Sequence, residues 1–414
     1  MEKKRRVFHR GKAAGYPPHE HVDLDHPLVV LADIIDWDAI ERVVPTPAMP
    51  GPGRPAVRTR LIAGLLYFEY AFKLSDSEVV ALWLESPYWQ IFTGETHLQT
   101  ELSIDPSSLS RWRKRLGEAG VEEMLARSIE AAERTGVIQA SSARRVIVDT
   151  TVMPKAIAYP TDSALLECSR AKLVKMAQQH GLGLRQNYNR NAPRLVRQIG
   201  RYAHARQYKR MHATIRLLRT RLGRVHRDIG RQREHVPQGR REQFDELMGR
   251  IGRILRQKKR DKNKLYALHA PEVECIAKGK TRTPDEFGVK VSIVTTWKEG
   301  QVLGSRSMPG NPFDGHTLDE ALEQAEILSD VKPTVAIVDR GYCSAEIDGV
   351  TIWRSGQKRG VTRAIKAMFH RRSAIEPTIG HMKAEGKLTG TGSKAHSATL
   401  YMPCCAVPAT TCAC

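Results

Sequence analysis

The sequence predicts an α/β protein that begins with an all-α domain and carries a helical insertion within its α/β part. Three patterns lead to this fold class. Short β-branched runs typical of buried strands occur at Val146–Val148 and Val335–Val338, and residues 286–296 alternate between apolar and polar side chains. Apolar stretches of helical character precede residue 140. A long basic segment with helical periodicity separates the first strand from the others.

Residues 1–140 are predicted to form the all-α domain. A Pro/Gly-rich linker at residues 45–55 precedes an apolar helix at residues 58–72. Ser75 and Glu78 then have the spacing of a capping box, which predicts the start of another helix. Helices are therefore expected throughout this part of the chain.

A basic helix is predicted near the end of this domain. Ser107 and Ser108 are expected to cap it, and its first turns hold a tryptophan and four cations. It resembles the second half of a helix-turn-helix, a motif that places a recognition helix in the major groove of DNA. The side chains that would contact DNA are those of Arg111, Arg113 and Lys114. The alternative is an ordinary basic surface helix.

Residues 163–270 are predicted to be a basic helical insertion. From Gly181 to Lys264 the chain has 25 Lys and Arg residues against 6 Asp and Glu, a difference of +19 that nearly equals the +21 of the whole chain. Apolar residues at a spacing of three or four predict a helical hairpin with one core-facing stripe: Ile215, Leu218, Leu222 and Val225. Charge of one sign repels itself unless a polyanion neutralises it, so Arg206, Lys209 and Arg210 are expected to bind the DNA backbone. A solvated spacer is the alternative.

Three carboxylates are the candidate reactive groups. Asp149 and Asp339 each follow an apolar, β-branched run, and each is expected at a break where its strand ends, although a single aspartate there is often an ordinary turn residue. Two such strands side by side would bring both carboxylates together, which is costly unless a cation lies between them. Adding Glu376 gives three hard oxygen ligands, and no Cys or His pattern competes for zinc, so the predicted metal is Mg²⁺ or Mn²⁺. Two such ions, about 4 Å apart, would serve phosphoryl transfer.

The segment around Glu376 has a helical repeat. One face of a continuous helix would carry four of its side chains: Phe369, Arg372, Glu376 and Lys383. Pro377 lacks an N–H and clashes with the carbonyl four residues earlier, so the helix either starts there or kinks. If it starts there, only Glu376 and Lys383 keep a common face. The alternative is a solvated helix with charge pairs four residues apart.

The rest of the α/β part contains the rival metal ligands. Asp314 and His316 follow a turn and precede a predicted helix, and either could bind a metal in place of the three carboxylates. The elements expected here are strands at residues 286–296 and 302–308 joined by a turn at 298–301, a helix at 318–328 and a last strand at 350–353.

Two motifs resemble a known family. The run Val338-Asp339-Arg340-Gly341-Tyr342 and the spacing aromatic-x2-Arg-x3-Glu-x6-Lys, together with the order Asp, Asp, Glu, resemble the DDE transposases of bacterial insertion sequences, in the large group related to insertion sequence five. The aromatic residue of this spacing is Phe369 here, where the family usually has tyrosine. The resemblance extends over nearly the whole chain, to about Leu388.

The resemblance implies a fold and roles for the site residues. A ribonuclease H-like catalytic domain would span residues 141–388, interrupted by the insertion at 163–270, and Asp314 would be a loop residue near the site. The implied ligands of two metal ions are Asp149, Asp339 and Glu376. Arg372 and Lys383 would hold DNA phosphate near the reacting bond, and the N-terminal domain would be a transposase domain that recognises the ends of the element.

The implied function is that of an enzyme, a metal-dependent endonuclease and strand transferase that moves a mobile element. Its partners would be double-stranded DNA, as terminal inverted repeats and as target, and a homodimer would assemble on that DNA. Two alternatives remain open from the sequence. One is a nuclease that cuts without joining, and the other is a catalytically inactive or decayed DNA-binding relative.

The composition fits a protein that binds polyanions. The chain has 66 Lys and Arg residues against 45 Asp and Glu, a formal charge of +21. A membrane surface is the competing partner, but no apolar run approaches the ~20 residues of a membrane span, and the basic start of the chain lacks the apolar core of a signal peptide. Only Cys168, Cys275 and Cys343 lie in the body of the chain, too far apart to suggest a disulfide framework. A cytoplasmic, nucleoid-associated protein without a membrane partner is expected.

Residues 389–414 are predicted to be an aberrant tail produced by a shifted reading frame. The tail has no clear apolar period, and Cys404-Cys405 and Cys412-Ala413-Cys414 lack the spacing of a zinc site. Synonymous codons can be chosen so that the same bases, read one position earlier, encode a leucine-rich segment at helical spacing that resembles the usual end of the family. Loss of that helix would remove apolar cover from the sheet and give a poorly stable, decayed transposase. The gene sequence decides this point.

Overall fold

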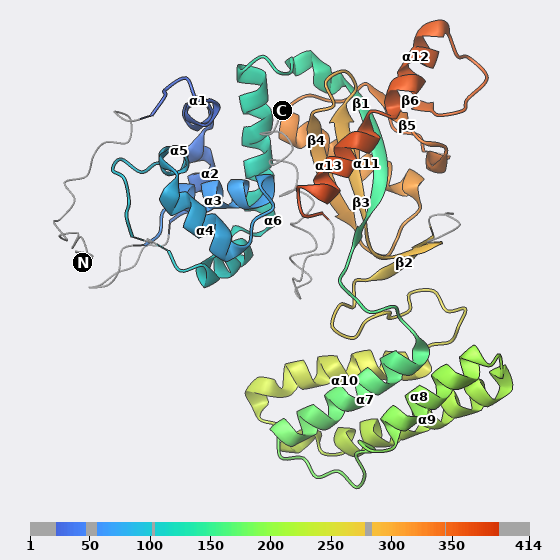
Figure 1. Cartoon of the computed structure of the whole chain (residues 1–414). Coiled ribbons are helices and arrows are strands. Elements are labelled where there is room, and N and C mark those ends of the chain that lie inside the picture. The colour runs from blue at the N-terminus through green and yellow to red at the C-terminus, as the bar shows by residue number, and fades with distance from the viewer. Residues whose placement is uncertain (1–21, 47–55, 102–103, 278–283, 344, 389–414) are drawn as a thin grey trace, which may run out of the picture.

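The computed structural model describes residues 22–46, 56–101, 104–277, 284–343 and 345–388. The strands in these ranges are β1 Arg145–Pro154, β2 Glu274–Ala277, β3 Asp285–Thr296, β4 Val302–Met308, β5 Val335–Val338 and β6 Thr351–Arg354. They form one six-stranded sheet with the order β2-β3-β1-β5-β6, and β4 also pairs with β3 (Figure 1). β3 runs antiparallel to β1, β2 and β4, whereas β5 runs parallel to β1 and β6. The predicted α/β class is confirmed.

β1 is longer than the sequence predicts. The break expected after Asp149 is wrong, because β1 continues to Pro154. β5 accompanies β1 only as far as Val148, which pairs with Val338, but β3 pairs with β1 as far as Pro154. The antiparallel partner therefore satisfies the backbone hydrogen bonds of β1 beyond Asp149. β3 is itself buried on both faces over residues 291–296, rather than half-buried, because helices cover both faces of the sheet.

Helices cover both faces of the sheet. α11 (Asp314–Ser329) packs on β1, β3 and β4, whereas α12 (Arg363–Arg372) and α13 (Ile375–Ala384) lie against β5 and β1 (Figure 1). Neighbouring side chains of a strand point to opposite faces. In β1, Thr150 bonds the start of α11 while Asp149 contacts the end of α12. α11 therefore lies on one face, and α12 lies on the other.

The N-terminal region is built from helices, as predicted. These are α1 Pro27–Ile34, α2 Trp37–Val43, α3 Thr59–Ala71, α4 Asp76–Glu85, α5 Pro87–Phe92 and α6 Ser107–Arg134. α3 is buried around nearly its whole circumference and forms the centre of this region. The predicted capping box is present at the start of α4, where the Ser75 N–H donates to Glu78 Oε2 at 2.7 Å and the Glu78 N–H donates to Ser75 Oγ.

α6 connects the N-terminal helices to the sheet. It bends at Gly117, whose φ of 64° lies in the left-handed region that glycine adopts readily. Beyond the bend, Val121, Met124 and Leu125 are buried, and the helix packs on α11 and β4. The N-terminal helices and the sheet share one continuous hydrophobic core. The boundary expected at residue 140 is therefore not marked by a break in the core.

The first half of α6 differs from the expected helix-turn-helix. α5 ends at Phe92, and residues 93–106 make a connection much longer than the three- or four-residue turn of that motif. Ser107 and Ser108 do not cap α6, because both lie within it, and Asp105 Oδ1 instead accepts the Ser107 N–H at 2.8 Å. The inward face of this half carries three buried apolar side chains: Leu109, Trp112 and Leu116.

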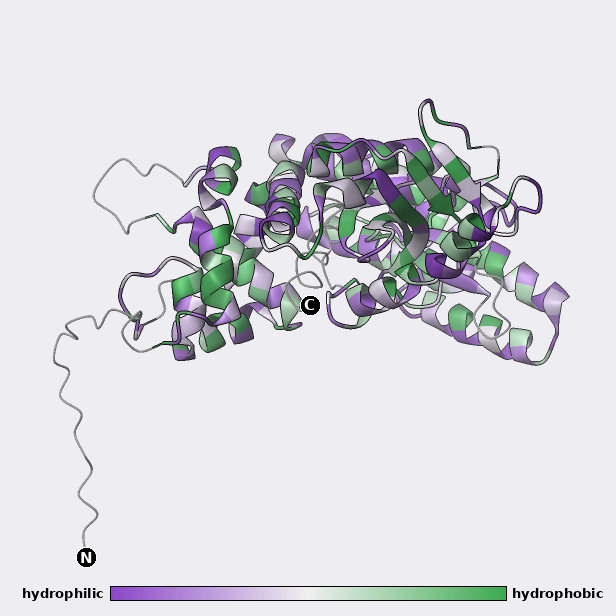
Figure 2. Cartoon of the chain, turned by 90° about the horizontal axis from the view of Figure 1, so that it is seen from above, coloured by the Kyte–Doolittle hydropathy of each residue, from purple (hydrophilic) through white to green (hydrophobic). Residues whose placement is uncertain are grey.

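The insertion is a four-helix unit with its own core, so the predicted hairpin, which corresponds to α9 and α10, is only half of it. Its helices are α7 Asp162–Gln179, α8 Ala192–His204, α9 Tyr208–Gly230 and α10 Arg241–Arg256. A hydrophobic cluster separate from the main core joins them. The predicted stripe of α9 is confirmed, with Leu218, Leu222 and Val225 buried. A hairpin alone would leave the apolar faces of α7 and α8 uncovered. The helices of the unit also carry many hydrophilic residues (Figure 2).

The neck joins the insertion to the sheet and consists of residues 155–161, after β1, and residues 257–273, before β2. Lys155 and Glu272, one from each segment, form a buried ion pair with an N to O distance of 3.7 Å, and both side chains are 3% exposed. Burial lowers the pKa of Lys155, and the charge of Glu272 opposes that shift. The pair therefore ties the two segments of the neck together.

Some sequence predictions fall outside the described residues. Most of the linker predicted at residues 45–55, namely residues 47–55, and the aberrant tail at residues 389–414 are among them. None of the helices in the described ranges combines the length and the apolar character that crossing a membrane requires.

Glu69 ties the N-terminal helices to the segment after α13. Its side chain is 5% exposed, and its carboxylate lies 2.5 Å from Arg113 Nη2 and 2.6 Å from Lys387 Nζ. Arg113 also pairs with Asp76. Burial lowers the pKa of Arg113, but the hydrogen bonds and charges of Asp76 and Glu69 raise it by more, so this pKa lies above its usual range. The network fixes α3, α4 and α6 against the segment that follows α13.

Glu69→Ala should lower the free energy of unfolding by about 3 kcal/mol, because Arg113 and Lys387 would keep partly buried charges without their partner. Thermal unfolding followed by circular dichroism measures the change. Glu85→Ala, at the exposed end of α4, is the matched control and should leave the midpoint unchanged. Equal midpoints for Glu69→Ala and the wild type would contradict the role given to this network.

Candidate functional site

Two aspartates lie side by side at the edge where β1 and β5 run parallel. The last residues paired between these strands are Val148 and Val338, so Asp149 and Asp339 are the next residue on each. Neighbouring strands are about 4.8 Å apart, which places the two carboxylates close together. The expectation that these strands are neighbours is confirmed. Asp339 also precedes a short 3₁₀ helix, η5, at Arg340–Tyr342.

Arg372 connects this edge to the third carboxylate. Its Nη1 lies 3.4 Å from Asp149 Oδ2, and its Nη2 lies 3.4 Å from Glu376 Oε1. The Arg372 side chain is 15% exposed, whereas that of Glu376 is 63% exposed. The guanidinium is therefore held between a strand carboxylate and a helix carboxylate, where it neutralises part of their charge.

The helix around Glu376 is kinked, which is one of the two expected forms, and the kink lies at Ser373 and Ala374, both of which keep right-handed helical dihedral angles. α12 ends at Arg372 and α13 begins at Ile375, two residues before Pro377. Pro377 lies in the first turn of α13, where a missing N–H leaves no helical hydrogen bond unmade. No continuous helix carries the expected face, but Arg372 and Glu376 still lie next to each other at the predicted spacing of four residues. Arg372 reaches Glu376 across the break between the helices, and Lys383 follows on α13, where it is partly buried.

The three carboxylates are of the type that binds divalent metals, but in this structure their side chains do not converge on one point. Within the described residues, no group of three carboxylate, imidazole or thiolate side chains stands close enough to hold a metal ion. Arg372 supplies the positive charge next to Asp149 instead. Asp149, Asp339 and Glu376 offer only hard oxygen donors, which suit Mg²⁺ or Mn²⁺. Such ions fit this donor set if the guanidinium of Arg372 moves aside.

Asp314 lies on the opposite face of β1. It is the first residue of α11, not the loop residue that was expected. Its Oδ1 accepts hydrogen bonds from Thr150 Oγ1 and from Lys290 Nζ, each at 3.0 Å. Lys290 neutralises this carboxylate, so Asp314 is paired within the protein. The other rival, His316, is exposed and packs edge-on against Phe313.

Tyr342 lies behind the site and was not singled out by the sequence patterns. Its side chain is 1% exposed. Burial raises the pKa of its hydroxyl well above the usual value, and the charges of Asp149 and Asp314 raise it further, so the phenol is neutral and lies near both carboxylates. The family-like run at residues 338–342 contained this residue, but only the fold shows that it is buried between them.

The cations expected to contact DNA occupy three separate places. Arg111 and Lys114 are exposed on α6, whereas Arg113 is turned inward to Glu69 and Asp76. Three more exposed cations lie at the α8–α9 turn and in the first turn of α9: Arg206, Lys209 and Arg210. Arg372 and Lys383 lie on α12 and α13 beside the carboxylates. The sequence could not place Arg113, because its partners are distant along the chain.

One protein family and one individual protein match this chain. The family described as Transposase domain (DUF772) matches residues 17–115. A Rhizobium meliloti protein named Uncharacterized protein ORF8 in nfe locus is 49% identical over 181 residues, which is 44% of this chain and 87% of that relative. The chain therefore contains a transposase domain and is a relative of the Rhizobium meliloti protein. No solved structure matches it.

The matched transposase domain and the candidate site are distinct parts of the chain. The match includes α1 to α5 and the start of α6, and with them Glu69, Asp76 and Arg113 of the ion-pair network. Asp149, Asp339 and Glu376 lie beyond it. The match to the transposase domain therefore rests on the N-terminal helices, whereas the candidate reactive groups lie on the sheet and its helices.

Gly341→Ala should lower the free energy of unfolding by about 2 kcal/mol, because the added methyl group would come within 2.8 Å of Asp314 Oδ2, which Lys290 and Thr150 hold in place. Gly239→Ala is the control, since nothing lies within 4 Å of its added methyl group. Chemical denaturation measures both variants.

The clash also predicts coupling between Gly341 and Asp314. In Gly341→Ala combined with Asp314→Ala, the methyl group no longer meets the carboxylate, so the double variant should be destabilised by less than the sum of the two single changes. Strictly additive changes would contradict the close approach of Gly341 to Asp314.

Proposed function

We propose that the protein is a DDE transposase of a bacterial insertion sequence, in the group related to insertion sequence five. Its activity would be metal-dependent hydrolysis of phosphodiesters at the ends of the element, followed by transfer of the freed 3′ strand to target DNA. The observation that carries the proposal is the parallel pairing of β1 and β5, which sets Asp149 beside Asp339. The mixed sheet with helices on both faces supports a ribonuclease H-like catalytic domain.

Asp149, Asp339 and Glu376 would hold two Mg²⁺ or Mn²⁺ ions. When bound, the ions would activate the attacking oxygen and stabilise the leaving oxygen of the phosphodiester. Arg372 would release Asp149 and Glu376, because their oxygens would be used by the metal. Its guanidinium would then be placed to hold a DNA phosphate next to the site, together with Lys383.

Double-stranded DNA is the proposed partner, as the terminal inverted repeats of the element and as the target. Arg111 and Lys114, on the exposed side of α6, would contact the element ends. The α8–α9 turn would hold the DNA backbone through Arg206, Lys209 and Arg210. A homodimer assembled on DNA would bring two ends together, and the protein would work at the nucleoid.

A DNA-binding relative without catalysis is the second candidate. It is favoured by the position of Arg372 between Asp149 and Glu376, and by the lack of a preformed metal cluster in the part of the chain that the structure describes. Such a protein would bind element ends but leave them intact with Mg²⁺ or Mn²⁺ present. Cleavage without joining would instead identify a nuclease.

Asp149→Ala, Asp339→Ala and Glu376→Ala should each abolish Mg²⁺-dependent cleavage of element ends while DNA affinity stays near that of the wild type, because each change removes a metal ligand and no cation. Cleavage of labelled duplexes and fluorescence anisotropy measure the two properties. Arg372→Ala and Lys383→Ala should reduce activity only in part, since each removes one cation that would hold a phosphate. Near-normal cleavage by any carboxylate variant would exclude that residue from the site.

Arg111→Gln combined with Lys114→Gln should reduce the preference for element ends over random DNA without changing stability, because both side chains are exposed. Arg113→Gln should instead lower the thermal midpoint, because it leaves Glu69 and Asp76 unpaired. Competition binding and thermal unfolding separate the two effects. Loss of preference in Arg113→Gln at unchanged stability would reverse these assignments.

A further inference from the structure

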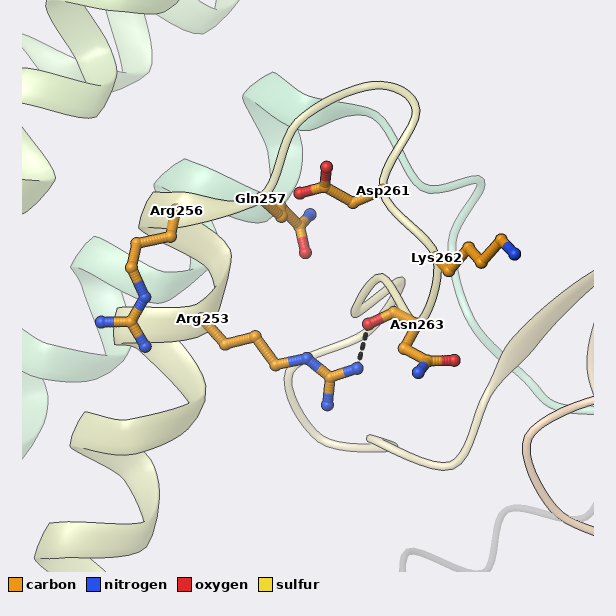
Figure 3. A pocket seen from close by; sticks show the side chains of 6 residues that line it. All are labelled: Arg253, Arg256, Gln257, Asp261, Lys262 and Asn263. Carbon is orange, nitrogen blue, oxygen red and sulfur yellow. Dashed lines mark hydrogen bonds between the residues drawn. The ribbon is translucent and has the colours of Figure 1, made fainter.

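The neck loop, residues 258–264, is the most concentrated cationic segment outside the site. It follows α10 and has the sequence Lys-Lys-Arg-Asp-Lys-Asn-Lys, with five cations and one carboxylate. A pocket of about 640 Å³ opens between this loop and the end of α10 (Figure 3). Its lining residues are Arg253, Arg256, Gln257, Asp261, Lys262 and Asn263.

The backbone of the neck loop is held in one shape. The side chain of Gln257, which is 8% exposed, closes the base of the loop by accepting the Leu265 N–H at 3.1 Å and donating to the Leu265 carbonyl at 3.3 Å. Asp261 Oδ2 accepts the Lys258 N–H at 2.8 Å. Arg253 donates to the carbonyl of Asn263 (Figure 3). The loop cations therefore project from a fixed frame rather than from a flexible linker.

Several cations of the loop and of the end of α10 have no acidic partner in the part of the chain that the structure describes. Across residues 104–277 and 284–343, no salt bridge involves Arg256, Lys259, Arg260 or Lys262. The carboxylate of Asp261, the one acid in the loop, is bonded to the backbone. Holding so much charge of one sign in a fixed loop is unfavourable unless an external polyanion neutralises it.

The loop lies next to the edge strand of the sheet. Residues 265–273 lead from the loop to β2. Burial raises the pKa of Glu274 on β2, and the charge of Arg253, which lines the pocket, opposes that rise. Gly288 of β3 pairs with both Glu274 and Pro154, and Pro154 is five residues along β1 from Asp149. With strand spacings of about 4.8 Å and a rise of about 3.4 Å per residue, Asp149 is about 20 Å from Glu274 at the start of β2.

This separation suits one DNA duplex that touches both places. Bases along each strand of duplex DNA are about 3.4 Å apart along the axis, so about 20 Å corresponds to about six base pairs. The side chains presented by the loop are mostly point charges on flexible stems, and the amide of Gln257 is already used within the protein. Such cations suit phosphate oxygens, and phosphate contacts fix the position of a protein on the duplex without carrying sequence information directly.

We propose that the neck loop, with Arg253 and Arg256, is a sequence-independent binding site for the phosphate backbone of duplex DNA, about six base pairs from the phosphate at Asp149. This inference rests on the proposed function, and it assigns the insertion a second DNA-binding segment besides the α8–α9 turn. DNA would run from the carboxylates along the neck, so the insertion would hold the flank of the duplex while the sheet holds the reacting bond.

The test is the salt dependence of binding by the full chain to a random-sequence duplex in EDTA, where catalysis plays no part. Lys258→Gln, Lys259→Gln, Arg260→Gln and Lys262→Gln combined should flatten the slope of log affinity against log salt by about 0.9 for each phosphate that the loop no longer binds. The control changes four exposed cations elsewhere on the insertion to Gln: Lys172, Lys175, Arg185 and Arg190. It should keep the wild-type slope, and thermal midpoints should show that both variants fold.

Two outcomes overturn the proposal. One is a wild-type slope in the neck-loop variant, and the other is an equal flattening in both variants, because charge anywhere on the insertion would then suffice. A hydroxyl-radical footprint should also lose protection about six base pairs from the cleaved bond in the neck-loop variant alone. Failure of the proposed function looks different: the wild type would bind DNA with a steep salt slope but leave element ends uncut with Mg²⁺.

Discussion

The parallel register of β1 and β5, which sets Asp149 beside Asp339, is the constraint on which the rest of the site depends. Parallel pairing of β1 and β5 sets these carboxylates at neighbouring positions, and two like charges so close together require a cation. Arg372 supplies one from the end of α12, and the break before α13 lets the same guanidinium reach Glu376. The strand register, the helix break and the inward Arg372 are therefore parts of one electrostatic arrangement.

The surrounding fold has two hydrophobic cores, one shared by the N-terminal helices and the sheet and one within the insertion. The N-terminal helices and the sheet share one core, and Glu69 adds ion pairs between them, so the α6 cations keep a fixed position relative to the carboxylates. The insertion has its own core and is joined through the neck, where Lys155 and Glu272 are paired. For a DNA-processing enzyme, this arrangement would hold one duplex at several distant points.

The sequence predicts those features that local patterns encode. The β-branched runs indicated the strands that carry Asp149 and Asp339, and the Ser75 capping box and the α9 stripe indicated helices. The prediction failed where residues distant in sequence determine the structure. For example, β1 extends past Asp149 because β3 pairs with it. The insertion is a four-helix unit because α7 and α8 cover apolar faces that are far away in sequence. The inward orientation of Arg113 toward Glu69 likewise cannot be predicted from the local sequence, because Glu69 is distant along the chain.

The central claim is that Asp149, Asp339 and Glu376 together hold divalent metal once Arg372 withdraws. Anomalous diffraction from crystals of the protein with Mn²⁺ and an element-end duplex tests it most directly. The account predicts manganese peaks between Asp149 and Asp339, with Glu376 as a further ligand and the Arg372 guanidinium moved onto a DNA phosphate. Manganese bound elsewhere, or Arg372 still lying between Asp149 and Glu376 with DNA in place, would contradict it.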